Sequence, residues 1–517
     1  MSEPAAPASS RGAAGVSGFE SFHPLVREWF ETNVGMPTAV QTEAWQRIAA
    51  GEHVLAMAPT GSGKTLAAFL HAISLLVSGA LPPEGLSVLY VSPLKALNED
   101  LRRNLELPLA GISRLFAERG EPCPEIRVET RSGDTPQSQR RRFLSKPPAI
   151  LCTTPESLAI LLDSPRARPV LSGIRLVVLD EIHAVAGSKR GSILASSVAR
   201  LALLAGEFQR VALSATLKPA EEVARFVGGV ALEREGKGKV AYRERKVAIV
   251  APPQEKTIEF RVLWPRAGAV AGASAGSAPG ASAGGGEAES RYDAIIPAIA
   301  ARLPGVRSLL VFTDSRRRAE RMAFLLNEAV GPGTAWAHHG SLAREARLVV
   351  EERFKAGELK CVVATASLEL GIDIGSVDEV ILAGAPPEVS SALQRAGRSG
   401  HGVGHVSKAT IYPFHDMDLL LAAAVVEGAE ARDVEALRIP RAPLDILAQQ
   451  VLSLATERER HCDELFDVVR SFPPFECLAR SLFDSTLDML AGRYAVRGPG
   501  GTSRIRELEP RVYFDRA

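Results

Sequence analysis

Ala58-Pro59-Thr60-Gly61-Ser62-Gly63-Lys64-Thr65 is the stretch on which the fold prediction depends. It follows an apolar run, His53–Ala58, that predicts a strand, and it precedes a helical pattern. Glycines between a strand and a helix let the backbone wrap around a phosphate and present its N–H groups. We therefore predict a phosphate-binding loop, in which Lys64 neutralises the β- and γ-phosphates and Thr65 holds Mg²⁺. The residues expected to contact the nucleotide are Thr60, Gly61, Ser62, Gly63, Lys64 and Thr65.

A second apolar run ends in two adjacent carboxylates. Leu176–Leu179 leads directly into Asp180-Glu181-Ile182-His183. Packing explains poorly why two carboxylates should stand at the end of a buried strand, so we expect a catalytic pair. Asp180 is placed to hold Mg²⁺, and Glu181 is placed to polarise the attacking water. On chemistry alone, His183 has either a coupling role or a structural one.

Strand-like and helical patterns alternate around these motifs, which predicts an α/β fold. The first set of apolar runs comprises His53–Ala58, Ser87–Ser92, Ala149–Thr153, Leu176–Asp180 and Arg210–Ser214. The second set comprises Ser308–Thr313, Thr334–His338, Lys360–Thr365, Val377–Leu382 and Ala409–Tyr412. Such alternation is typical of parallel, doubly wound sheets with ligand groups at the carboxyl ends of the strands. We predict two parallel-sheet domains in tandem.

The second block carries an arginine-bearing element, Gln394-Arg395-Ala396-Gly397-Arg398-Ser399-Gly400. An arginine that reaches a nucleotide from another domain stabilises charge on the transferring phosphoryl group. We therefore expect ATP to lie between the two domains, with Lys64 on one side and Arg398 on the other. Hydrolysis would then drive relative motion of the domains.

The pattern becomes helical from about Leu419 onward. Three helices are predicted around Leu444–Leu454, Leu465–Phe472 and Leu478–Leu490, and the last stops at Gly492 before a strand-like Tyr494–Val496. Three helices followed by a short wing predict a small α+β winged-helix domain.

Changes in composition predict the boundaries between these units. Residues 267–290 consist mostly of Ala, Gly and Ser, so this stretch is predicted to be a flexible insertion. The predicted units are a disordered N-terminus at 1–18, a first domain at 19–235, a connector at 236–291 with the insertion at 267–290, a second domain at 292–418, a winged-helix domain at 419–510 and the start of a further module at 511–517.

Composition excludes some classes of protein. The net charge is +1, so any nucleic-acid binding must rely on local basic patches. The five cysteines form no C-x-x-C pair, which favours reduced thiols in the cytoplasm. The longest apolar run, Leu419–Val426, is far shorter than the ~18 residues of a membrane span. We expect a soluble cytoplasmic protein that has no membrane partner and works in a bacterial-type cytosol or nucleoid.

With these residues in order, the chain resembles superfamily 2 helicases of the DExH-box type. The words that narrow the resemblance to the Lhr ("large helicase-related") family are Arg131-Ser132-Gly133-Asp134-Thr135, Thr153-Thr154-Pro155-Glu156-Ser157-Leu158, Asp180–Gly191 and Ser367–Gly375. The resemblance covers residues from about 20 to 510. It implies two RecA-like domains, an ATP-dependent helicase that travels 3′ to 5′, and a role in DNA repair.

The resemblance also implies roles for single residues. Gln41 would read the adenine edge, and Phe22 is a candidate to stack on the base. Arg398 would be the arginine finger, supported by Arg395 and Gln394, while Asp373 would lie near the ribose or phosphates. The residues that would couple the γ-phosphate to the nucleic acid are His183, Ser214 and Thr216. The sequence departs from the commonest pattern at His401, where a second arginine often stands.

Motif order also selects a set of nucleic-acid-binding candidates. Hydroxyls and single cations suit phosphate oxygens, which position a strand without reading its sequence. The candidates are Lys95, Arg131, Thr153, Thr154, Ser315, Arg317, His339 and Thr365. Arg140–Arg142 and Arg316–Arg318 add local charge, although such runs are often solvated helix faces.

These observations predict an ATP- and Mg²⁺-dependent helicase or translocase that moves on single-stranded DNA. Its expected partners are single-stranded or partly duplex DNA, with an RNA–DNA hybrid as a further substrate. Two alternatives stay open: an RNA helicase with the same phosphate-gripping motifs, and a nucleic-acid-binding scaffold without motor activity. The presence of Lys64, Asp180, Glu181 and Arg398 disfavours the scaffold.

Overall fold

The computed structural model describes residues 18–492 and 511–512, apart from 60, 236–238, 254–256, 266–285, 370, 372–373, 376 and 401–405. Several predictions lie outside these residues: those for Thr60, Asp373 and His401, the strand Tyr494–Val496, the N-terminus and most of the 267–290 insertion. The side chain of Lys95 is also outside the description. Among the described helices, none combines the length and apolar character that crossing a membrane requires.

The first domain is built on a parallel sheet of seven strands in the order β3-β4-β2-β5-β6-β1-β9. Its central strands are buried along their whole length, as expected for a sheet covered on both faces. The strands are β1 (His53–Met57), β2 (Val88–Val91), β3 (Val128–Arg131), β4 (Ile150–Thr153), β5 (Leu176–Leu179), β6 (Gln209–Ser214) and β9 (Val247–Val250).

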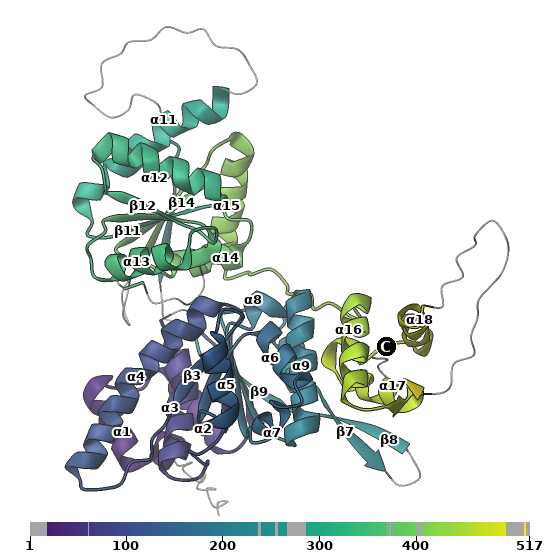
Figure 1. The fold of residues 1–517 in the computed structure, drawn as a ribbon. Helices are drawn as coiled ribbons and strands as arrows, with labels where there is room; N and C mark the ends of the chain where they lie inside the picture. Colours follow the sequence, from purple (N-terminus) through teal and green to yellow (C-terminus); the bar gives the residue numbers. More distant parts are fainter. Residues whose placement is uncertain are drawn as a thin grey trace, which may run out of the picture.

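Helices cover both faces of this sheet (Figure 1). One face packs against α1 (Pro24–Asn33), α2 (Ala39–Ala49), α3 (Lys64–Val77) and α4 (Lys95–Glu118). The other packs against α5 (Gln137–Ser145), α6 (Pro155–Asp163), α7 (Arg168–Leu171), α8 (His183–Ala186), α9 (Lys189–Ala205) and α10 (Ala220–Gly228). The catalytic candidates therefore extend from the carboxyl ends of strands held between two cores.

The second domain has a parallel sheet of six strands in the order β10-β15-β14-β11-β13-β12. Its strands are β10 (Ile258–Val262), β11 (Leu309–Thr313), β12 (Ala335–His338), β13 (Cys361–Ala364), β14 (Glu379–Ala383) and β15 (Ser407–Tyr412). One face packs against α11 (Gly286–Ala300) and α12 (Arg316–Val330), the other against α13 (Arg344–Lys355) and α15 (Asp416–Glu430). The short α14 (Val389–Ala396) carries Gln394 and Arg395.

The structure divides the chain differently at two predicted boundaries. The predicted connector at 236–291 includes β9, which joins the first sheet, and β10, which joins the second. Helix α15 was assigned to the winged-helix unit, but it packs on the second domain, where Ala422 lies in the core. The apolar run at Leu419–Val426 gave no indication of which neighbour it covers.

The third unit contains α16 (Leu444–Glu457), α17 (Cys462–Arg470) and α18 (Arg480–Leu490), with a short antiparallel pair formed by β16 (Arg460–His461) and β17 (Arg511–Val512). The predicted helical residues Leu447, Val451, Leu454, Val469 and Phe472 form its core. Two parallel-sheet α/β domains followed by this small α+β unit confirm the predicted fold class.

The third unit docks on the first domain through a buried charged cluster. Arg200 on α9 has a side chain only 2% exposed, and its Nη2 lies 2.9 Å from Asp163 Oδ1 and 2.8 Å from Glu457 Oε1 on α16. A hairpin formed by β7 (Val230–Glu235) and β8 (Lys239–Glu244) extends from the first domain toward α17 (Figure 1), where Tyr242 donates a hydrogen bond to the Asp467 carbonyl. The two units thus share an interface that is partly closed to water.

We expect Arg200→Met to weaken this interface. Removing the buried guanidinium leaves Asp163 and Glu457 facing each other, which should cost about 1–3 kcal/mol because both carboxylates keep some access to water. The measurement is the urea midpoint of the transition reported by a probe in the third unit. Arg243→Met, which removes an exposed partner of Glu233, is the matched control and should shift the midpoint little. Equal shifts in the two variants would contradict the assignment.

Candidate active site

The phosphate-binding loop opens into a cavity of about 830 Å³ at the carboxyl edge of the first sheet. Gly61 and Gly63 adopt left-handed conformations, with φ of 82° and 81°, and Gly63 is the residue directly before α3. A Cβ at Gly63 would lie 2.5 Å from Gln41 Nε2, so this position requires glycine for two reasons. Gly61, Ser62, Gly63, Lys64 and Thr65 all line the cavity.

Lys64 is buried beneath the loop and directed at its carbonyl groups. Its Nζ donates hydrogen bonds to the carbonyl oxygens of Ala58 and Pro59. Burial lowers the pKa of Lys64, while Glu181 and Asp180 act in the opposite direction. A bound phosphate would offer this ammonium better acceptors than the loop carbonyls.

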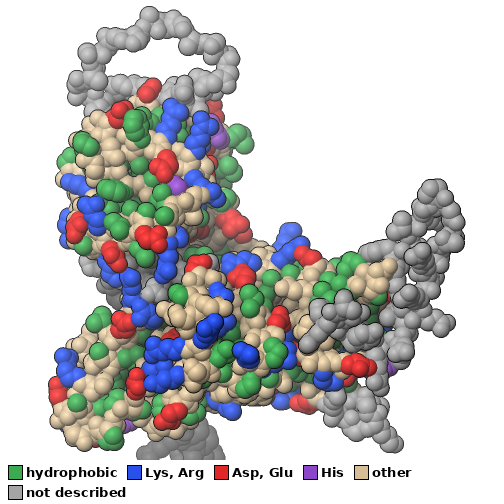
Figure 2. All heavy atoms as spheres, in the orientation of Figure 1, with side chains coloured by type: hydrophobic (Ala, Val, Ile, Leu, Met, Phe, Trp, Pro, Cys, Tyr) green, Lys and Arg blue, Asp and Glu red, His purple; other side chains and the backbone are tan. Residues whose placement is uncertain are grey.

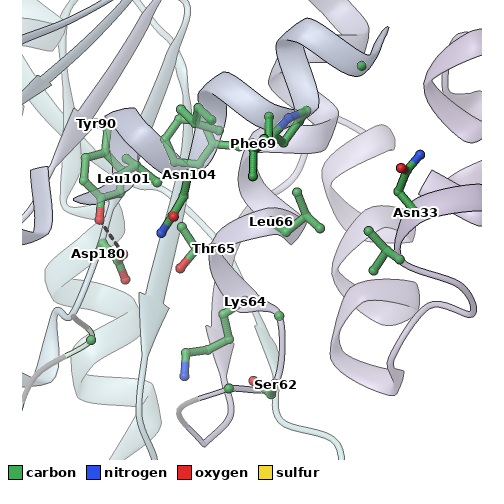
Figure 3. A pocket seen from close by; sticks show the side chains of 18 of the residues that line it. Asn33, Ser62, Lys64, Thr65, Leu66, Phe69, Tyr90, Leu101, Asn104 and Asp180 are labelled. Atoms are coloured by element: carbon green, nitrogen blue, oxygen red, sulfur yellow. Dashed lines mark hydrogen bonds between the residues drawn. The ribbon is translucent and has the colours of Figure 1, made fainter. Parts of the chain in front are cut away.

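Asp180 lies at the bottom of the same cavity, together with a tyrosine that the sequence analysis did not select. Tyr90 on β2 donates a hydrogen bond of 2.5 Å to Asp180 Oδ2, and the Glu181 amide donates one of 2.8 Å to Oδ1. Burial, followed by the charge of Glu181, raises the pKa of Asp180 to about 7. Figure 3 shows Thr65 directed toward Asp180 from the first turn of α3, with Asn104 beside it.

Glu181 has a left-handed backbone with φ of 47°, an uncommon conformation for a residue with a side chain. Strain of this kind concentrates at functional sites. Its Oε2 lies 3.4 Å from His183 Nδ1, which also accepts a hydrogen bond of 3.1 Å from the Ala215 amide. Ser214 Oγ lies 3.3 Å from the same nitrogen, so two of the three predicted coupling residues are in contact.

The second domain contributes two predicted residues, Gln394 and Arg398, and one further residue, Gly371, to this region. Burial lowers the pKa of His183, and the side chain of Gln394 reaches the ring and opposes that shift. Arg398 is 4% exposed. Burial is the main cause that lowers the pKa of Lys64, and the positive charge of Arg398 lowers it further. Gly371 lines the cavity from the same side. Predicted catalytic groups from both domains therefore meet at one cleft.

Glu369 is a second residue that the sequence analysis missed. Its Oε2 accepts a hydrogen bond of 2.8 Å from Arg395 Nε, and its backbone carbonyl accepts one of 2.7 Å from Arg398 Nη2. One residue thus orients both arginines. No local sequence signal distinguishes Glu369 from an ordinary solvated glutamate, because its role depends on a contact with residues 26 and 29 positions away.

The expectation that Phe22 stacks on the adenine was wrong. Phe22 is 3% exposed and packs edge-on against Trp45 in the core of the first domain. Gln41 is also buried, where its Oε1 accepts from the Thr38 amide at 2.9 Å and its Nε2 donates to the Gly63 carbonyl at 3.2 Å. Gln41 thus secures the phosphate-binding loop here, and adenine recognition stays a prediction.

A second cavity, of about 1050 Å³, lies between the two α/β domains and is here called the groove. Basic side chains border the junction of these domains in Figure 2. Of the predicted nucleic-acid contacts, Arg131 and Thr365 line the groove. Three more arginines come from the basic runs that the sequence analysis named: Arg140, Arg142 and Arg316. The groove is also lined by arginines that no prediction included: Arg102, Arg103, Arg190, Arg344 and Arg347.

Other predicted contacts are placed less favourably. Ser315 and Arg317 are exposed at the start of α12. Thr153 and Thr154 are buried, and their hydroxyls bond the Arg131 carbonyl and Ser157. His339 is 5% exposed and pairs with Glu320 at 2.7 Å. These three are held inside the protein and do not face the groove.

Three comparisons with known proteins agree with this arrangement. Residues 38–225 match the model of the DEAD/DEAH box helicase family, residues 293–402 that of the helicase conserved C-terminal domain, and residues 427–498 that of the large helicase-related protein winged helix domain. The fold and site thus define a DEAD/DEAH-type helicase.

The relatives narrow the assignment. The chain is 41% identical to the Lhr helicase/uracil glycosylase of Escherichia coli, and the match covers 92% of this chain and 32% of that protein. It is 42% identical to ATP-dependent helicase Lhr-Core protein 2 of Thermococcus barophilus, where the match covers 91% of this chain and 52% of that protein. A solved structure of Mycobacterium smegmatis helicase Lhr bound to ssDNA and AMP-PNP superposes with a TM-score of 0.79 at 44% identity, covering 92% of this chain and 58% of that one. The chain belongs to the Lhr family of helicases. It spans only a third to a half of the curated relatives' length.

We expect Glu369→Ala to lower kcat for ATP hydrolysis by about tenfold, because Arg395 loses its charged acceptor, whereas the backbone carbonyl that binds Arg398 is kept. Steady-state hydrolysis measures this effect. Glu369→Gln keeps one acceptor and should recover part of the rate, whereas Glu358→Ala, at an exposed surface pair, should behave as wild type. An unchanged kcat in Glu369→Ala would refute the positioning role.

Proposed function

We propose that this chain is an ATP- and Mg²⁺-dependent DNA helicase or translocase that moves along single-stranded DNA. The solved Lhr relative was bound to ssDNA and AMP-PNP, which is what a chain with both cavities should hold. The observation that carries the proposal is the groove, which is lined by arginines of both domains and lies at the same junction as the nucleotide cleft. A strand held there contacts both moving parts.

The composition of the groove favours backbone recognition. Arginines and hydroxyls bind phosphate oxygens irrespective of base, as a translocase requires. Arg131 and Arg190 enter from the first domain, and Arg316, Arg344 and Thr365 from the second. Movement of one domain relative to the other would therefore shift one set of phosphate contacts along the strand.

The donor set near Lys64 fits Mg²⁺. The Thr65 hydroxyl and the Asp180 carboxylate are hard oxygen ligands at the end of the phosphate-binding loop, and Mg²⁺ is usually held by one or two such groups plus substrate phosphates. When bound, the ion would supply charge neutralisation at the phosphates. Tyr90 and the Glu181 amide keep the Asp180 carboxylate in a fixed orientation.

The other residues have separate roles in hydrolysis. Glu181 polarises the attacking water, and Lys64 and Arg398 stabilise charge on the transferring phosphoryl from opposite domains. His183 contacts Ser214 and Ala215 of the first domain, and Gln394 of the second domain opposes the lowering of its pKa, so we infer that His183 reports nucleotide state across the cleft.

Direction, pathway and location rest on the family resemblance. We propose 3′-to-5′ travel on the loading strand, a role in DNA repair, and action in the cytoplasm. An RNA helicase is the second candidate, since phosphate-directed contacts suit either polymer. Solved RNA-bound helicases share the fold at only 14–15% identity, so they do not favour it.

The test is steady-state ATP hydrolysis without nucleic acid, with single-stranded DNA and with single-stranded RNA. We expect stimulation by DNA, and loss of hydrolysis by at least about a hundredfold in Glu181→Gln because the attacking water is no longer polarised. Stimulation by RNA alone would make the RNA helicase the better assignment. Wild-type hydrolysis in Glu181→Gln would remove the catalytic assignment, and Lys64→Ala with full activity would revive the scaffold.

Arg344→Ala should weaken binding of single-stranded DNA and reduce the slope of log Kd against log salt by about 0.7, because one phosphate contact is lost. Fluorescence anisotropy over a salt series gives both values. Arg353→Ala is the matched control on α13, since Arg353 stacks on Trp336 and pairs with Glu358 outside the groove. A salt slope that falls equally in both variants would contradict the proposed path of the strand.

A further inference from the structure

Residues 432–442, here called the strap, link α15 of the second domain to α16 of the third unit. Both ends have left-handed backbones at residues with side chains: φ is 52° at Arg432 and 47° at Ala442. Such conformations persist only where surrounding contacts fix them. The strap therefore has a defined backbone conformation, and its contacts with the two domains show what holds that conformation.

The first part of the strap is bound to α14, the helix that carries Gln394 and Arg395 and ends two residues before Arg398. Glu435 Oε1 accepts a hydrogen bond of 2.5 Å from the Val389 amide, and Oε2 accepts one of 3.2 Å from the Ser390 amide. Val389 and Ser390 form the first turn of α14, and Val434 packs with Val389 in a small apolar cluster. Glu435 thus closes the N-terminus of α14.

The second part is bound to the first domain, next to its catalytic loops. The Leu437 amide donates a hydrogen bond of 2.7 Å to the Lys218 carbonyl, and Ala436 forms a bridge with the same residue. Leu437 also packs so tightly on Gly187 that a Cβ there would lie 3.0 Å from Leu437 Cδ1. Lys218 follows the Ser214–Thr216 turn, and Gly187 ends α8, the helix that begins at His183.

We propose that the strap holds the arginine-bearing helix in register with the catalytic loops of the first domain, with Glu435 as the positioning residue and the Glu435–Ala436 junction as the pivot. This inference rests on the proposed ATPase function. The backbone contacts of the strap with the first domain begin at Ala436, and before that point the described side chains add the exposed ion pair of 2.9 Å between Asp433 and Lys218, so we place the pivot at this junction.

The physical basis is the charge and geometry at the N-terminus of α14. A carboxylate that accepts two first-turn N–H groups also opposes the positive end of the helix dipole. Burial raises the pKa of Glu435, but its hydrogen bonds with the backbone amides outweigh that effect and hold the pKa below its usual range. Because α14 is a short rigid rod, a shift at Val389 is carried to Gln394 and Arg395. The turn after the helix passes the shift on to Arg398, whose amide donates a hydrogen bond of 3.1 Å to the Arg395 carbonyl.

The test compares Glu435→Ala, Glu435→Gln and Glu430→Ala in DNA-stimulated ATP hydrolysis. We expect kcat to fall about tenfold in Glu435→Ala, with the KM for ATP and the half-saturating DNA concentration unchanged, because the arginines act on the transition state. Glu435→Gln keeps one oxygen that can accept a hydrogen bond from the first turn of α14. Its log kcat should therefore lie at least halfway from that of Glu435→Ala to that of the wild type. Glu430, an exposed residue at the end of α15, is the matched control.

The outcomes separate this inference from the function on which it rests. If DNA does not stimulate wild-type hydrolysis, the proposed function fails. If DNA stimulates the wild type but Glu435→Ala matches it, or if Glu435→Gln is as slow as Glu435→Ala, the positioning role fails. Melting temperature recorded for each variant identifies a merely structural defect, which would lower stability and leave kcat per folded molecule unchanged.

Discussion

The structure depends on one electrostatic constraint: the cations proposed to balance the charge of a triphosphate come from two separate domains. Lys64 lies on the first domain beside two carboxylates, while Arg395 and Arg398 lie on the second, held by Glu369. Charge interactions strengthen as water leaves a cleft, so nucleotide favours the closed arrangement. In the proposed mechanism, hydrolysis and product release then remove that preference. Domain motion would follow from where the cations are placed.

The other parts of the chain are arranged to use this motion. The third unit is joined to the first domain by the buried Arg200 cluster and the β7–β8 hairpin, so these two parts form one side of the cleft. The second domain forms the other side. The groove has walls from both α/β domains, and the strap connects the two sides beside the catalytic loops. In the proposed function, nucleotide state and grip on the strand would therefore change together.

Local sequence predicted most of the fold, because hydrophobic runs and glycine-rich turns are local signals. Each of the ten apolar runs predicted as strands of the two sheets overlaps an observed strand, and the phosphate-binding loop precedes α3 as expected. Strand β3 was missed because Val128-Glu129-Thr130-Arg131 is a half-buried edge with polar side chains. Tyr90, Glu369 and Glu435 were missed for another reason: each acts through contacts with residues distant in sequence. Phe22 was misassigned because its position suggested a role that its burial against Trp45 excludes.

The most direct test of the account is the distance between the two α/β domains in solution. Fluorescent labels on α5 and α12, in a background with Cys123, Cys462 and Cys477 replaced by serine, report it by energy transfer. The account predicts a shorter distance when AMP-PNP and single-stranded DNA are both present, and no shortening in Arg398→Ala, because the cation that draws the second domain onto the phosphates is lost. A wild-type protein that hydrolyses ATP while this distance stays constant would contradict the account.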